Sequence, residues 1–76
     1  MVSVVAADLQ RARAVKAQLA ERLRAEPDVN GVGLARRPGG WAVKVNLVRS
    51  APQLVLPSQI DGVEIYTDVV GPIVAQ

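Results

Sequence analysis

The sequence predicts an α+β fold in which one N-terminal helix packs on a three-stranded sheet. Three observations lead to this prediction. Helix-forming residues without Gly or Pro fill the first third of the chain, the hydrophobic period then changes to that of a strand, and turn residues separate three strand-like runs. A chain of 76 residues has the size of one small domain, so residues 1–76 are expected to fold as a single unit.

The helix is expected over residues 3–26. This segment is rich in Ala, Leu, Arg and Gln, which favour helices. Ser3 or Asp8 is placed to cap its first turn, and Pro27 ends it. At about 100° per residue, one face collects Val5, Leu9, Ala12, Leu19, Ala20 and Leu23. Lys16 interrupts this face. We expect the aliphatic part of its side chain to pack on the core while its ammonium group reaches water.

Two strands are expected over residues 29–36 and 41–48, joined as a hairpin by the turn at 37–40, which contains Pro-Gly. The pairs that place all large apolar residues on one face are Arg36–Trp41, Leu34–Val43, Val32–Val45 and Asn30–Leu47. A slip of one residue would expose this set and bury polar side chains, so the alternation determines the register. The helix is expected to cover this face.

A third strand is expected over residues 63–70, followed by a tail at 72–76. The connection before it, 49–62, is expected to contain one helical turn at 57–60. A connection of this length is long for a hairpin, so the third strand is expected beside the first and parallel to it. This order of helix, strand, strand, strand resembles a ferredoxin-like fold that lacks its first strand and second helix.

The sequence contains no Cys and no His, which limits the catalytic and metal-binding groups that are available. No thiolate nucleophile, thiolate metal site or histidine base is available, and the Ser and Thr hydroxyls have no histidine to activate them. We therefore predict that the chain is not an enzyme and takes no cofactor and no metal. The apolar runs are too short to cross a bilayer and the N-terminus has no secretory pattern, which predicts no membrane partner and a cytoplasmic location.

The basic residues are concentrated in residues 1–49, which carry a net charge of +5, whereas residues 50–76 carry −3. An ordinary solvated surface explains this distribution, and weak nucleic-acid binding is the alternative. Its basic residues would be Arg11, Arg22, Arg24, Arg36 and Arg37. Arg36 and Arg37 are the candidate anion contacts, because they lie beside Trp41 at the hairpin tip, but one Trp and one Tyr make a poor stacking surface.

The Gly-Val-Gly at residues 31–33 begins a dinucleotide-binding fingerprint, but these glycines lie within a strand rather than in a strand-to-helix turn. We interpret them as positions where a partner, a loop or Tyr66 approaches the backbone closely. One helix leaves the second sheet face bare, where Val29, Val48 and Val70 would meet water. The residues predicted to form an interaction face there are Gly31, Gly33, Lys44, Asn46 and Tyr66. Its partner would be an unknown protein or a second copy, and an exposed strand edge is the other candidate surface.

Three segments, "VNGVGLARRPGGWAVKVNLV", "LPSQIDGVEI" and "VVGPIVA", resemble small bacterial domains of uncharacterised function that occur ahead of trypsin-like serine protease domains. The resemblance covers about residues 29–75. It implies a non-catalytic accessory module, to which no catalytic residue is carried over. An inhibitor or propeptide-like partner of a protease is a further reading that this resemblance implies.

Overall fold

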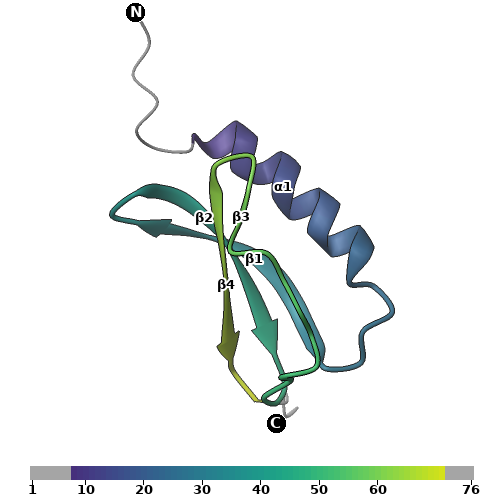
Figure 1. Cartoon of the computed structure of the whole chain (residues 1–76). Coiled ribbons are helices and arrows are strands. Elements are labelled where there is room, and N and C mark those ends of the chain that lie inside the picture. Colours follow the sequence, from purple (N-terminus) through teal and green to yellow (C-terminus); the bar gives the residue numbers. More distant parts are fainter. Residues whose placement is uncertain (1–7, 72–76) are drawn as a thin grey trace, which may run out of the picture.

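A computed structural model describes residues 8–71 (Figure 1). Its elements are α1 (Leu9–Arg22), β1 (Val29–Arg37), β2 (Gly40–Leu47), β3 (Gln59–Ile60) and β4 (Val63–Val69). The helix is followed by one mixed sheet of four strands in the order β1-β2-β4-β3. The predicted α+β class is therefore confirmed, whereas the predicted number of three strands is wrong.

Helix α1 is capped by Asp8, whose carboxylate accepts a hydrogen bond of 2.7 Å from the Arg11 N–H. The helix was expected to run to residue 26 but ends at Arg22. After Leu23 the hydrogen bonds reach back only three residues, as from the Glu26 N–H to the Leu23 carbonyl. The chain thus tightens ahead of Pro27, which disfavours helical geometry at the residue before it. The expected helical residues 3–7 lie outside the described part of the chain.

The buried side of α1 differs slightly from the predicted one. Its buried side chains are Ala12, Val15, Leu19 and Leu23. Val15 belongs to this side although it was not predicted there, while Leu9 and Ala20 are only half-buried. The buried stripe is therefore rotated about the helix axis relative to the prediction. Lys16 is half-buried at the border of the stripe, as expected for a stem that packs on the core.

Strands β1 and β2 form the predicted antiparallel hairpin. The pairs Arg36–Trp41, Leu34–Val43 and Val32–Val45 are confirmed. A bulge between Val29 and Gly31 then shifts the register, so that Val29 rather than Asn30 pairs with Leu47. As a result Val29 packs against the core instead of lying on the open face, and the prediction for this end of the strand is wrong.

Strand β4 lies beside β2 and parallel to it, with Val43 opposite Ile65 and Leu47 opposite Val69. The prediction that this strand lies beside the first strand is wrong. The segment between β2 and β4, which we call the crossover, has its buried Ala51 in the same core as α1, and Leu54 and Leu56 pack against that core. The crossover therefore covers the part of the sheet face that α1 leaves bare. This position of the crossover goes together with β4 lying beside β2 and not beside β1.

Strand β3 pairs antiparallel with the start of β4, with Ile60 opposite Val63. The two residues between the strands, Asp61 and Gly62, both have positive φ, of 52° and 78°. Asp-Gly is a preferred sequence for such a tight hairpin turn. The helical turn expected at 57–60 is thus replaced by the first strand of a short hairpin.

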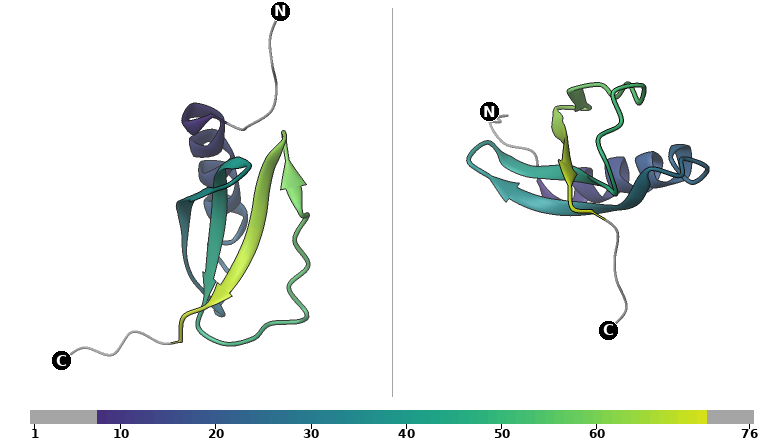
Figure 2. Two further views of the ribbon diagram at one scale, coloured as in Figure 1. Left: turned by 90° about the vertical axis from the view of Figure 1, so that its left-hand side faces the viewer. Right: turned by 90° about the horizontal axis from the view of Figure 1, so that it is seen from below.

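One face of the sheet and the elements above it make an aliphatic core, whose largest fully buried side chains are Leu19, Val15, Val43, Val45 and Val63. No segment of residues 8–71 covers the second face, which we call the open face (Figure 2). Within the same residues, no helix is long and apolar enough to span a membrane.

Candidate interaction surfaces

The register of the sheet brings the predicted interaction residues together on the open face. Three rows run across β1, β2 and β4: Ala35–Ala42–Glu64, Gly33–Lys44–Tyr66 and Gly31–Asn46–Asp68. All five predicted residues lie in the second and third of these rows. The β1 side of the open face consists of backbone and one methyl group, whereas long polar side chains stand on the β4 side.

Arg37 reaches from the end of β1 across the sheet to β4. Its guanidinium carbon lies 4.2 Å from the centroid of the Tyr66 ring, and its Nη2 donates to Glu64 Oε2 at 3.2 Å. Both charged side chains are more than 40 % exposed, so this ion pair stabilises the fold only weakly. The contact nevertheless occupies Arg37, which the sequence proposed as a contact for an anion.

The remaining charges of the open face are also matched. Lys44 Nζ lies 3.7 Å from Asp68 Oδ2. Beside this pair, the Asn46 Oδ1 atom is buried without a hydrogen-bond partner in the described part of the chain. With two cations and two carboxylates, the open face carries no net charge. It is therefore not a surface that attracts an anionic polymer.

Gly31 and Gly33 are not explained by the contacts of the described chain. Neither has a positive φ, and a Cβ atom added at either would have no neighbour within 4 Å. The expectation that a loop or Tyr66 approaches these glycines is therefore wrong for residues 8–71. Glycine in a strand interior destabilises a protein by roughly 0.5–1 kcal/mol relative to Ala. A close approach by another molecule stays a prediction.

Backbone hydrogen bonds at the end of β2 define which way its residues face. The Val70 N–H donates to the Leu47 carbonyl from the β4 side, and the Val48 N–H donates to the Asp28 carbonyl on the β1 side. Because these directions alternate along a strand, odd-numbered residues of β2 bond to β4 and even-numbered residues bond to β1.

The even-numbered residues of β2 are paired with Gly31, Gly33 and Ala35. These three residues therefore use their backbone groups within the hairpin. The residues that alternate with them direct their N–H and C=O groups away from the sheet: Val32, Leu34 and Arg36. We call this row of outward backbone groups the β1 edge, and no described segment lies beside it (Figure 2, left).

The two ends of the β1 edge carry features that discourage pairing, namely the bulge at Asn30 and Pro38 after the strand. The stretch between them, residues 31–35, has no charged side chain. A long outer strand with an uncharged centre is a template for another strand. Sequence reasoning named a strand edge as a candidate but did not identify β1 as the outer strand, because that depends on where β4 pairs.

The arginines of the nucleic-acid alternative are divided between the helix and the hairpin tip. Arg36 lies over the Trp41 ring, 5.3 Å from its centroid, and Arg24 Nη1 lies 2.9 Å from Glu21 Oε2. Together with Arg37, three of the five arginines are thus engaged by side chains of their own chain. Arg11 and Arg22 are exposed on α1.

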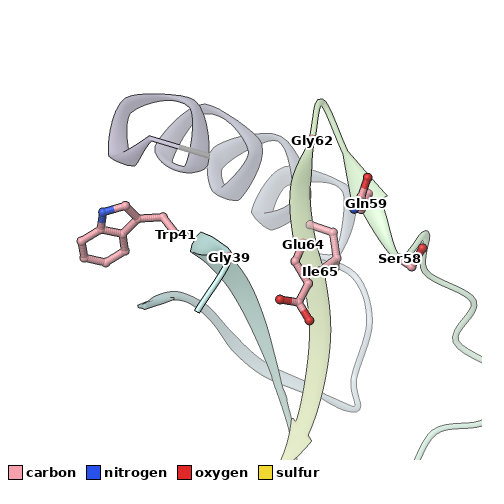
Figure 3. A pocket seen from close by; sticks show the side chains of 8 residues that line it. Gly39, Trp41, Ser58, Gln59, Gly62, Glu64 and Ile65 are labelled. Atoms are coloured by element: carbon pink, nitrogen blue, oxygen red, sulfur yellow. The ribbon is translucent and has the colours of Figure 1, made fainter. Parts of the chain in front are cut away.

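A depression of about 440 Å³ lies between the hairpin tip and the β3–β4 hairpin (Figure 3). Its lining residues are Gly39, Gly40, Trp41, Ser58, Gln59, Gly62, Glu64 and Ile65. Figure 3 shows the Trp41 ring turned away from the other labelled side chains. Glu64 is the one titratable residue of this lining, so the depression offers no pair of groups for acid–base chemistry. Residues 8–71 contain no cluster of three or more possible metal ligands among His, Cys, Asp and Glu.

The comparisons with known proteins leave the chain without an assigned family. No protein-family model matches it, and searches of curated proteins and of solved structures gave no significant match. The resemblance to segments ahead of protease domains therefore stays a prediction.

Proposed function

We propose that this chain is a non-enzymatic protein-interaction module that binds an extended strand of a partner along the β1 edge. The observation that carries the proposal is the row of outward backbone groups at Val32, Leu34 and Arg36, which no described segment pairs. Main-chain hydrogen bonds to such an edge supply affinity, and the side chains on either side of it supply specificity.

The composition of β1 favours this edge over the centre of the open face. The charged groups of the open face already satisfy one another through the Arg37–Glu64 and Lys44–Asp68 pairs. A partner on that face would have to break these pairs. At the β1 edge, Gly31 and Gly33 project no side chain, so a second strand meets no steric obstacle on the open side.

Nucleic-acid binding has less support, because three of the five arginines proposed for it contact side chains of their own chain. A salt titration with single-stranded DNA separates the two proposals. Binding that neutralises phosphates weakens steeply as the salt concentration rises, whereas strand pairing depends little on salt.

The proposal is tested by selecting binders from a displayed library of random peptides, using the dilute wild-type chain and the V32P variant. The Val32 N–H points to the free edge, so proline removes an outward donor without removing a hydrogen bond of the hairpin. Because the Val32 side chain also packs against the core, circular dichroism first establishes that V32P is folded. The control is V55P, the same change in the crossover, where Val55 is 84 % exposed.

We expect selected peptides to bind the wild type and V55P and to bind V32P at least about ten-fold more weakly. In amide NMR spectra, the bound peptide should protect the N–H groups of Val32, Leu34 and Arg36 from exchange. Failure to select any peptide, or selection of peptides that bind V32P and the wild type equally, would contradict the proposal.

A further inference from the structure

We infer that the β1 edge pairs antiparallel with the β1 edge of a second copy of this chain, around a two-fold axis at Gly33. The inference rests on the proposed function, that the β1 edge takes up a strand, and it specifies that strand. Three features carry it: the charges at the two ends of β1, the direction of the backbone groups and the positions of the glycines.

The two ends of β1 carry opposite charges. Glu26 and Asp28 precede the strand, and Arg36 and Arg37 close it. Within one copy Asp28 already pairs with Arg49 and Arg37 with Glu64, so Glu26 and Arg36 are the charges that a second copy meets. In an antiparallel pair, the arginine end of each copy lies beside the acidic end of the other. A parallel pair would place like charges together, which is unfavourable. The charges of Glu26 and Arg36 therefore favour the antiparallel direction over the parallel one.

The direction of the backbone groups restricts the register. Hydrogen-bonded pairs between two copies must join outward-facing residues, so Val32 of one copy faces Leu34 of the other when the axis lies at Gly33. The same register leaves the bulge at Asn30 and the proline at Pro38 outside the central pairs.

The glycines occupy the close positions of this pairing. With the axis at Gly33, the non-hydrogen-bonded pairs are Gly33 with Gly33 and Gly31 with Ala35, where Cα atoms approach to about 4.5 Å. These are the smallest residues of β1. The pairing thus supplies a reason for two glycines that neither backbone conformation nor the contacts of the described chain explain.

The helices are compatible with this arrangement. Helix α1 contacts mainly β1 and β2 and, to a smaller extent, β4, so its axis lies roughly above the first two strands. Across the two-fold axis, the helices of the two copies would then be about two strand spacings apart, or roughly 10 Å. Packed helices are 8–10 Å apart. The backbones of the two helices would therefore fit side by side on the covered face of a continuous eight-stranded sheet.

The inference is tested by sedimentation equilibrium of the wild type, G33E, G33K and an equimolar mixture of the two variants. Nothing lies within 4 Å of a Cβ atom at position 33. In G33E the new carboxylate faces Lys44 of its own hairpin, so the fold is expected to be retained. The matched control is G31E, because a side chain at position 31 would face Ala35 of the other copy rather than its own equivalent.

We expect the wild type and G31E to dimerise and the dissociation constants of the G33E and G33K dimers to rise at least about ten-fold, since like charges would meet at the axis. The mixture of G33E and G33K should form a one-to-one heterodimer, because opposite charges then face each other. Circular dichroism and thermal melting establish that each variant is folded. If G33K is not folded, the comparison of G33E with G31E still decides the question.

A wild-type chain that stays monomeric at high concentration overturns this inference and leaves the peptide selection as an independent test of the proposed function. A wild-type dimer that G33E does not weaken also overturns it, because the axis would then lie elsewhere. Selection of peptides at the β1 edge by a monomeric chain would show that the edge binds strands of other proteins and not its own.

Discussion

At the scale of single residues, the stability of this small domain depends on a few side chains with defined contacts. Asp8 is one of them, since its carboxylate accepts the Arg11 N–H at the start of α1. The D8A variant removes this acceptor and should lower the free energy of unfolding by about 1 kcal/mol. Urea denaturation followed by circular dichroism measures the change. D8N keeps an acceptor and serves as the control; equal stability of D8A and the wild type would contradict the capping role.

Leu19 is the largest fully buried side chain of the core, with 0 % of its surface exposed. The L19A variant should lower the free energy of unfolding by about 2–5 kcal/mol, because it leaves a cavity among tightly packed aliphatic groups. Domains of this size have little stability to lose, so a partly unfolded variant is an expected result. The exposed V55A provides the comparison, and a similar urea midpoint for both variants would contradict the packing described for α1.

The sequence did not predict that Val15 is buried and that Val29 packs against the core. A helical projection about an assumed centre placed Leu9 and Ala20 inside and did not select Val15, because the rotation of a helix is set by the sheet below it. Val29 was expected on the open face, and the bulge at Asn30 moved it to the core. A bulge inserts one residue into one strand, and the alternation of apolar residues carries no sign of it.

At the scale of elements, local patterns predicted the β1–β2 hairpin and its central register correctly. Large apolar residues alternate with small or polar ones, and Pro-Gly marks the turn, so both signals are local. The neighbour of β4 was predicted wrongly because it depends on the path of the crossover. Ala51, Leu54 and Leu56, which hold that path on the core, form no regular pattern in the sequence.

The β3–β4 turn gives a test at this scale. Gly62 has a φ of 78°, which favours glycine, whereas Gly39 has no positive φ and no atom near an added Cβ. G62A should therefore lower the free energy of unfolding by about 1 kcal/mol or more, and G39A should change it little. The two variants are compared by urea denaturation. If G62A were as stable as G39A, the Asp61-Gly62 turn would have another geometry.

At the scale of the whole molecule, the sequence predicted an α+β domain with one bare sheet face, and the five predicted interaction residues do share that face. Two aspects of the candidate site could not be predicted from the sequence. The engagement of Arg37 by Tyr66 and Glu64 requires β4 to be placed next to β2. The free edge could be assigned to β1 only after that same placement, since either hairpin strand was available as the outer one.

The two-residue strand β3 has a consequence for the size of any assembly. Together with the crossover, it lies alongside β4 and leaves β1 as the one long outer strand without a neighbour in residues 8–71 (Figure 2). A protein with two open edges can add copies at both sides without limit, and such contacts lead to fibres. If two copies pair through their β1 edges as inferred, the pairing uses the long outer strand of each copy. The outer edge of the two-residue strand β3 is too short a template to add a third copy.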